Sequence, residues 1–264
     1  MSSDLTNPVA PLFAPLVGQP TAIALLTQAV QRDRVAPGYL FAGAEGVGRA
    51  LAARCFIQAL FARSSPTDKA SVLYQRLHQG NHPDVLWVAP TYQHQGKLLT
   101  VAEAEMQGIS RRSAPAIRLE QIRQITQFLS RPPLEADRSI VVLENAETMA
   151  EAAANALLKT LEEPGQATVI LIAPSADAML PTLVSRCQRI PFQRLDPAAM
   201  TQVLTQIGHH HILNYPELLA MAQGSPGAAI AALRQYQAIP PELLQATVEL
   251  PTSLRSALEL ARQI

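Results

Sequence analysis

The 264-residue sequence is poor in cysteine and aromatic residues, and it carries no excess of charge of either sign. Its two cysteines, Cys55 and Cys187, are too few for a disulfide framework, which favours a reducing compartment. Lysine and arginine together number 21 and are balanced by 21 acidic residues, so nothing indicates a chain that binds nucleic acid on its own. The N-terminus has no signal-peptide pattern, and no apolar stretch is long enough to span a bilayer. These absences favour a cytoplasmic protein without membrane association.

The hydrophobic fraction of 48% and the charged fraction of 16% are typical of a folded globular chain long enough for more than one domain. Apolar runs typical of buried strands alternate with helical patterns, which predicts a parallel α/β sheet. The strand-like runs are residues 39–42, 85–89, 139–143, 168–173 and 189–192, and the helical patterns are residues 21–32, 51–57, 118–129 and 152–162. From Asp196, the predicted N-cap of a helix, only helical patterns follow. Residues 91–115 are polar and show no pattern, and we interpret them as a loop or insertion.

Residues 43–50 keep the glycine spacing of a phosphate loop, G-x-x-x-x-G-K-[ST], between a predicted strand and a predicted helix. Backbone N–H groups around glycines of this spacing, together with the following helix N-terminus, are suited to hold a phosphate. Hydrolysis also requires a lysine and a hydroxyl that holds Mg²⁺, whereas Arg49 and Ala50 stand at those two positions. Arg49 keeps a positive charge but has a planar, forked head, and Ala50 offers no metal ligand. The motif is therefore degenerate: hydrolysis is not expected, nucleotide binding is left open, and the candidate contacts are Gly43, Gly46, Gly48 and Arg49.

Two further segments carry a family resemblance. Residues 155–164 read Asn-Ala-Leu-Leu-Lys-Thr-Leu-Glu-Glu-Pro, and Ser185, Arg186 and Cys187 follow in the expected order. Both segments resemble the signature motifs of AAA+ clamp-loader subunits, the replication factors that open and load sliding clamps, and the resemblance extends roughly over residues 18–233. It implies a RecA-like AAA+ P-loop domain with a parallel sheet over residues 1–194. A small helical lid is then expected over residues 195–236, and the start of a truncated helical collar over residues 237–264.

The resemblance also implies that other nucleotide-handling residues are absent. The ATPases of the family carry an Asp-Glu pair after the third predicted strand, and here the pair is Glu144 and Asn145. An asparagine cannot act as a general base. Ala173 and Pro174 stand where a polar sensor is expected, and Gly227 stands where an arginine is expected. These positions predict a subunit that does not hydrolyse ATP by itself.

Arg186 resembles the arginine finger that clamp-loader subunits present to the ATP of a neighbouring subunit. Such an arginine stabilises the charge that develops on a transferred phosphoryl group. The resemblance therefore implies a catalytic role for Arg186 in trans, and a subunit interface at Ser185, Arg186 and Cys187. The alternative is a structural arginine that pairs with an acidic neighbour. Cys187 itself is interpreted as a small packed hydrophobe.

As a whole, the resemblance implies a non-hydrolysing stator of the bacterial DNA polymerase III clamp loader. Its expected partners are the motor subunits (gamma/tau), the wrench subunit (delta) and, through the complex, the sliding clamp and primed DNA. Two alternatives stay open: a working or nucleotide-binding AAA+ ATPase of DNA metabolism, and a DNA-binding module that uses the fold as a scaffold. Turnover by the isolated chain would favour the first, and tight, salt-dependent DNA binding without partners would favour the second.

No metal site is expected. Members of the family often carry a four-cysteine zinc module before the segment that begins at His82, but residues 59–80 contain no cysteine. His82 is interpreted as a structural residue. The histidines at 209–211 are adjacent, and adjacent side chains on a helix diverge, so we interpret them as part of a solvated loop between helices. Neither zinc nor another resident cofactor is predicted.

Overall fold

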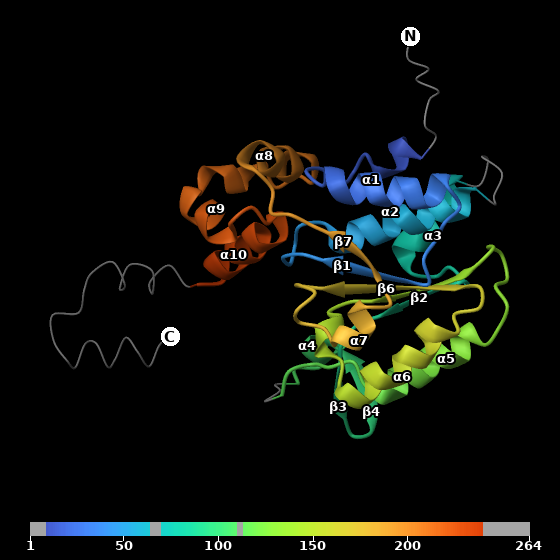
Figure 1. Ribbon diagram of the computed structural model, residues 1–264. Helices are drawn as coiled ribbons and strands as arrows, with labels where there is room; N and C mark the ends of the chain where they lie inside the picture. Colours follow the sequence, from blue (N-terminus) through green and yellow to red (C-terminus); the bar gives the residue numbers. More distant parts are fainter. Residues whose placement is uncertain (1–8, 64–69, 110–112, 240–264) are drawn as a thin grey trace, which may run out of the picture. The chain divides into compact units, whose positions relative to one another are not determined.

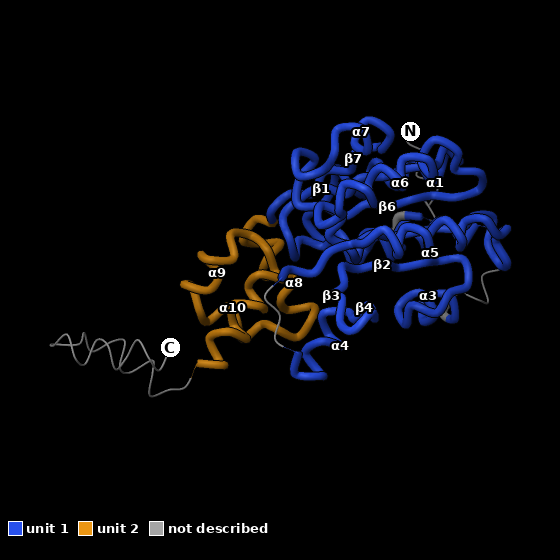
Figure 2. The backbone as a smooth tube through the Cα atoms, turned by 90° about the horizontal axis from the view of Figure 1, so that it is seen from below, with its two compact units in different colours: residues 1–194 blue, residues 195–264 orange. Residues whose placement is uncertain are grey.

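The computed structural model of the chain describes residues 9–63, 70–109 and 113–239 (Figure 1). The chain divides into two compact units, residues 1–194 and residues 195–264 (Figure 2). Every strand among the described residues belongs to the first unit, whereas the described part of the second unit contains helices only. Most of the segment expected to begin a collar, from residue 240 onward, lies outside the described residues.

Five parallel strands form the main sheet of the first unit, in the order β2-β5-β6-β1-β7. Every residue of the neighbouring strands β5 and β6 is buried. Strands that are buried on both faces need continuous apolar runs, which is why the sequence reveals their positions. The predicted parallel α/β sheet is confirmed, and its strands are β1 Gly38–Ala42, β2 Val85–Val88, β5 Ser139–Leu143, β6 Ala167–Ala173 and β7 Gln188–Pro191.

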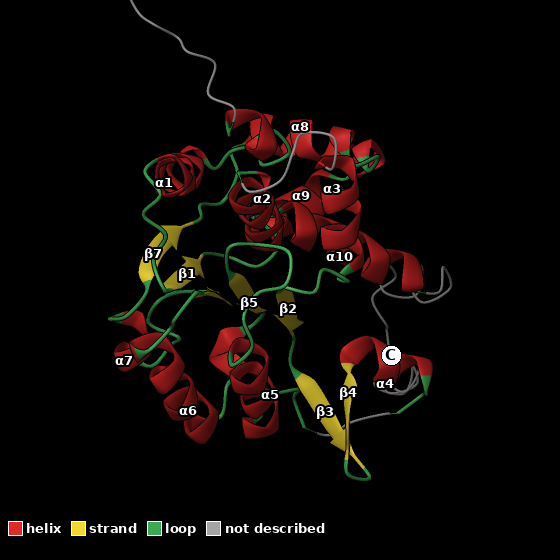
Figure 3. Ribbon diagram, turned by 90° about the vertical axis from the view of Figure 1, so that its right-hand side faces the viewer, coloured by secondary structure: helices red, strands yellow, loops and turns green. Residues whose placement is uncertain are grey.

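Helices cover both faces of this sheet, with α1, α2 and α3 on one face and α5, α6 and α7 on the other (Figure 3). On the second face, Ile122 and Ile125 of α5 join Leu157 and Leu161 of α6 in a buried cluster with the central strands. The helices are α1 Pro20–Gln31, α2 Arg49–Ala62, α3 Ala70–Gln79, α5 Leu119–Leu129, α6 Glu151–Glu162 and α7 Pro181–Val184, with two short 3-10 helices, η1 Ala10–Phe13 and η3 Ala146–Thr148.

Residues 91–115 are not the loop that the sequence pattern predicts. They contain a β-hairpin, made of β3 Thr91–His94 and β4 Lys97–Thr100, which is followed by α4 Val101–Met106. Gln95 and Gly96 connect the two strands with positive φ angles of 47° and 80°, the backbone that suits a two-residue hairpin turn. The prediction was wrong because these short strands form a separate two-stranded sheet and bury few side chains, so they lack the apolar runs of the main sheet.

The described part of the second unit consists of α8 Pro197–Gln206, η4 His210–Asn214, α9 Pro216–Ala222 and α10 Pro226–Ala238. Asp196 is the N-cap of α8, as predicted, and its carboxylate accepts a hydrogen bond from the Ala199 N–H at 2.8 Å. The histidines at 209–211 are not in an open loop, since two of them begin η4 and the Nδ1 atom of His209 is buried.

Across the residues that the structure describes, no group of three or more His, Cys, Asp or Glu side chains is arranged to hold a metal ion. None of the described helices is both long and apolar enough to cross a membrane.

Candidate functional site

The degenerate phosphate loop follows the carboxyl end of β1 and leads into α2, as its motif predicts. Gly48 is the N-cap of α2 and has a φ of +102°, a left-handed backbone that favours glycine, and Gly46 has a φ of +75°. Gly43 is required for a different reason, because a Cβ atom there would lie 2.5 Å from the carbonyl oxygen of Phe192. The three candidate glycines therefore lie in the loop between β1 and α2, next to the helix N-terminus where an intact motif would hold a phosphate.

Gln19 fixes the phosphate loop from inside the protein. Gln19 is only 2% exposed, and its Nε2 atom donates to the carbonyl oxygens of Val47 at 3.2 Å and of Gln193 at 2.7 Å. Its Oε1 atom accepts a hydrogen bond from the Gln193 N–H at 2.9 Å. Buried Leu16 packs on the same loop, since a Cβ atom at Gly48 would lie 2.9 Å from Leu16 Cδ1. Protein groups thus hold the loop, and sequence reasoning missed Gln19 because no local pattern reveals a bond between such distant segments.

Arg49 occupies the position of the phosphate-loop lysine, at the first residue of α2. It is 7% exposed, and its Nη1 atom is buried without a hydrogen-bond partner. Burial lowers the pKa of Arg49, although the carboxylates of Glu147, Glu45 and Glu144 act in the opposite direction. Burial also raises the pKa of Glu147. Three acidic side chains therefore act on the charge of Arg49.

The residues that follow β5 and β6 are Glu144 and Asn145 in the first case and Pro174 in the second. Glu144 is half-buried, and its backbone N–H donates to the Val88 carbonyl oxygen at 2.9 Å. Asn145 is exposed, has a φ of 48° and precedes η3 as its N-cap. Ala173 ends β6 with an exposed fraction of 0%, so no polar sensor stands there, and Gly227 lies in α10 of the second unit. Glu144 and Asn145 therefore lie at the carboxyl edge of the sheet, as does the glycine loop.

Arg186 follows α7 at the protein surface and is held at two points. Its Nη2 atom pairs with Glu162 Oε1 at 2.6 Å, and its Nη1 atom donates to the Thr182 carbonyl oxygen at 3.0 Å. The side chains of Arg186 and Glu162 are 37% and 50% exposed. Both alternatives from the sequence therefore stay open, because Arg186 is accessible to a partner and also pairs with an acidic neighbour.

The phosphate loop and Arg186 belong to opposite edges of the sheet. β1 and β7 are parallel neighbours, with Tyr39 paired to Gln188 and Ala42 paired to Pro191. The loop follows the carboxyl end of β1, whereas Arg186 precedes the amino end of β7. The residues of β7 alone span about 13 Å, at roughly 3.3 Å per residue. Arg186 is therefore distant from the phosphate loop of its own chain.

Ser185 and Cys187 fix the backbone on either side of Arg186. Ser185 Oγ donates to the Thr182 carbonyl oxygen at 2.9 Å, and the Cys187 N–H donates to the Val184 carbonyl oxygen at 3.2 Å. Burial raises the pKa of the Cys187 thiol to about 11, and it raises the pKa of Cys55 to about 11 as well. Both thiols are therefore protonated near neutral pH. Cys187 has the character of a small packed side chain, as predicted.

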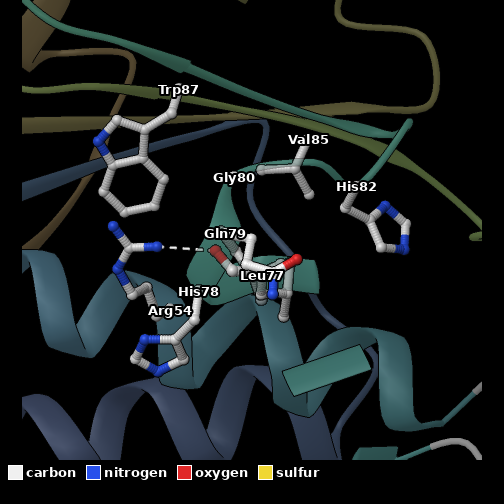
Figure 4. A pocket seen from close by; sticks show the side chains of 9 residues that line it. Arg54, Leu77, His78, Gln79, Gly80, His82, Val85 and Trp87 are labelled. Carbon is white, nitrogen blue, oxygen red and sulfur yellow. Dashed lines mark hydrogen bonds between the residues drawn. The ribbon is translucent and has the colours of Figure 1, made fainter. Parts of the chain in front are cut away.

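A separate cavity of about 250 Å³ lies between α2, α3 and β2 (Figure 4). The Arg54 guanidinium lies over the Trp87 ring, 4.4 Å from the ring centroid, and its Nη1 atom donates to the Leu77 carbonyl oxygen at 2.8 Å. Members of the family often carry a four-cysteine zinc module in this part of the chain, but residues 59–80 contain no cysteine, and the described part of that segment comprises the end of α2 and α3.

The residues at the edge of this cavity are structural. His82 is 7% exposed, and its Nδ1 atom accepts a hydrogen bond from the Asp84 N–H at 3.2 Å. Burial lowers the pKa of His82. The buried Asp84 carboxylate accepts backbone hydrogen bonds from Leu134 at 2.6 Å and from Glu135 and Ala136 at 2.8 Å each. These contacts agree with the structural interpretation of His82, because this segment anchors β2 and the loop before β5.

Comparison with known proteins gives matches over most of the chain. A family model described as DNA polymerase III, delta subunit, matches residues 18–196, and one described as cyanobacterial DNA polymerase III delta prime, C-terminal domain, matches residues 198–264. The delta' subunit of DNA polymerase III from Bacillus subtilis (strain 168) is 31% identical over 191 residues, which are 71% of this chain and 51% of that protein. The delta' subunit from Pseudomonas aeruginosa is 33% identical over 208 residues, 77% of this chain and 57% of that protein.

A further relative is the DNA polymerase III subunit tau from Bacillus subtilis (strain 168), which is 25% identical over 199 residues, 74% of this chain and 31% of that protein. The chain spans about half the length of the delta' relatives that it matches. The matched residues include the phosphate loop, residues 155–164 and Arg186.

Proposed function

The chain belongs to the DNA polymerase III delta-prime family, and on that premise we propose that it is the non-hydrolysing stator of a bacterial clamp loader. A neighbouring motor subunit binds and hydrolyses ATP, and this chain offers Arg186 to that ATP in trans. The observation that carries the proposal is the separation of Arg186 from its own phosphate loop, at the opposite edge of the sheet. An exposed arginine in this place is suited to a nucleotide that another subunit holds.

The phosphate loop of this chain supports a role without hydrolysis. Ala50 offers no hydroxyl for Mg²⁺, and Asn145 offers no general base. Arg49 is a buried cation whose charge is opposed by nearby carboxylates, so a bound nucleotide would bring further negative charge beside them. Gln19 holds the loop backbone through hydrogen bonds within the protein. We infer that the loop is kept as part of a rigid scaffold.

Arg186 has the chemistry that a role in trans requires. A guanidinium stays protonated and presents five N–H donors in a planar fork that matches phosphate oxygens. Glu162 and Thr182 engage one N–H donor each. The remaining donors are available for the charge that develops on a transferred phosphoryl group.

The proposed partners follow from the family. The tau subunit among its relatives identifies the kind of chain that would act as the motor. We propose that this chain acts in the bacterial cytoplasm within the assembled complex. There it is associated with the wrench subunit (delta), the sliding clamp and primed DNA. The balance of 21 basic and 21 acidic residues argues against tight DNA binding by the isolated chain.

Pre-steady-state phosphate release by the reconstituted clamp loader tests this function. Arg186→Ala should slow hydrolysis at the adjacent motor site by on the order of 10³-fold, as expected for loss of an arginine finger. In the presence of clamp and primed DNA, the amplitude of the fast phase of phosphate release should therefore fall by the amount that one ATP site contributes. The isolated chain should show no turnover.

The control variant is Arg131→Ala, because Arg131 is an exposed arginine that follows α5 on a different part of the first unit. Size-exclusion chromatography should show equal assembly of both variants and the unsubstituted chain. A full fast phase with Arg186→Ala would contradict the role in trans. Turnover by the isolated chain would instead favour the ATPase alternative.

A further inference from the structure

Glu162 is the carboxylate that holds Arg186. The pair joins the ends of two helices, because Glu162 is the last residue of α6 and Arg186 follows α7. Glu162 Oε1 contacts Nη2 at 2.6 Å, and the Thr182 carbonyl oxygen contacts Nη1 at 3.0 Å. Since the two anchors engage different nitrogen atoms, they fix the orientation of the guanidinium plane as well as its position.

Glu162 stands where an acidic side chain is electrostatically unfavourable by itself. The C-terminus of an α-helix has free carbonyl groups and a partial negative charge, so cations are favoured there. α6 nevertheless ends with Glu162, and Glu163 follows it, with both residues exposed. Among the described ion pairs, Glu162 has Arg186 as its partner and Glu163 takes part in none. Arg186 is therefore the cation that lies beside Glu162, and Glu163 provides a matched comparison.

Packing already fixes the backbone around Arg186. A Cβ atom at Gly38 would lie 2.9 Å from Cys187 Sγ and 3.2 Å from the Arg186 carbonyl oxygen, so this segment lies directly against the start of β1. The Arg186 N–H donates to the Leu183 carbonyl oxygen at 3.1 Å. The freedom that remains is in the side-chain torsions of Arg186, and the contacts with Glu162 and Thr182 restrict it.

We propose that Glu162 is a positioning residue for Arg186, which it holds in the orientation that meets the phosphate of ATP on the adjacent subunit. This inference rests on the proposed role of Arg186 in trans. Glu162 does not touch the nucleotide. It orders the guanidinium before the subunits engage, so that less conformational freedom is lost when the phosphate is contacted.

The test is steady-state ATP hydrolysis by the reconstituted complex, with clamp and primed DNA present. Glu162→Ala should lower kcat at the adjacent site by about 10- to 100-fold, because a misplaced catalytic group has an effect of this order. The KM for ATP should change little, since the motor subunit holds the nucleotide. Glu162→Gln should restore most of the kcat, because its amide oxygen can still accept from Nη2. Glu163→Ala, the matched control, should behave as the unsubstituted chain.

Combining the substitutions separates a positioning role from a general loss of stability. In the Arg186→Ala background, Glu162→Ala should cause no further loss of kcat, because the group that it positions is gone. If Arg186→Ala lowers kcat but Glu162→Ala leaves it unchanged or raises it, the positioning role is wrong and the proposed function stands. If Arg186→Ala itself has no effect, the proposed role of Arg186 fails and this inference fails with it. Equal assembly and equal thermal unfolding of all variants are required for either conclusion.

Discussion

Replacing Gln19 with leucine should destabilise the first unit, because leucine has a similar size but forms none of the three hydrogen bonds of the amide. The substitution removes the partners of the Val47 carbonyl and of both backbone groups of Gln193, at a site that is 2% exposed. At about 1 kcal/mol net for each neutral hydrogen bond, the free energy of unfolding should fall by about 3 kcal/mol. The phosphate loop should then lose its connection to the segment after β7.

Gln19→Glu should be more destabilising than Gln19→Leu at neutral pH. One oxygen of the new carboxylate would keep the Gln193 N–H as a donor, but the other would face the two carbonyl oxygens that now accept hydrogen bonds from Nε2. A buried ionised group with one oxygen against two acceptors is strongly penalised. Burial raises the pKa of such a carboxyl, so the penalty is present above that pKa and falls as the pH is lowered through it. Protonation also provides one O–H donor. Gln19→Glu should therefore regain stability in acid relative to Gln19→Leu.

Urea unfolding followed by tryptophan fluorescence measures both effects, because Trp87 is the one tryptophan of the sequence and lies in β2 of the same unit. The control is Gln124→Leu on the exposed side of α5, which should change the free energy of unfolding by less than about 0.5 kcal/mol. Equal unfolding midpoints for Gln19→Leu, Gln19→Glu and the unsubstituted chain would refute the argument that the Gln19 amide holds the loop.

Asp84→Ala should lower the free energy of unfolding by about 3–5 kcal/mol. Each of the three backbone hydrogen bonds to the carboxylate contributes about 1.5–3 kcal/mol, and water replaces part of this when the carboxylate is removed. Urea unfolding should show a smaller loss for Asp84→Asn, whose amide oxygen still accepts, and equal losses would contradict the account. Cys55 and Cys187 should react slowly with iodoacetamide in the folded chain at neutral pH, and the rate should rise toward pH 11, because burial raises both thiol pKa values to about 11. In the unfolded chain both thiols have pKa values near 9, so they lose their protons at a lower pH than in the folded chain. The free energy of unfolding should therefore fall as the pH rises from 9 to 11. A constant unfolding midpoint over that range would count against the burial of these thiols.

The shape of the phosphate loop does not depend on the residues at positions 50 and 145. The shape of the loop depends on Gly46 and Gly48, on the close approach of Gly43 to Phe192, and on the Gln19 amide. None of these contacts involves the positions at which Mg²⁺ and the general base would act. The proposed absence of hydrolysis is therefore compatible with the packing of the loop between β1 and α2.

The sequence by itself determined the fold class, the main strands and the degenerate loop. β5 and β6 are buried on both faces, so their own side chains must be apolar along the whole strand. The cap at Asp196 and the left-handed turn at Gly48 are likewise local, since each depends on a residue and its immediate neighbours. Such features can be read without knowing which distant segments they meet.

Only the tertiary structure decided which distant groups come together. Gln19 forms hydrogen bonds with Gln193, which is 174 residues away in the sequence, and Arg186 pairs with Glu162, which is 24 residues away. No periodic pattern in the sequence predicts either contact. The hairpin of β3 and β4 buries too little apolar surface to leave a pattern. The placement of Arg186 and the phosphate loop at opposite edges follows from the parallel pairing of β1 with β7. The burial of a strand depends on its own side chains, whereas these contacts depend on the path of the chain between elements, which local sequence does not specify.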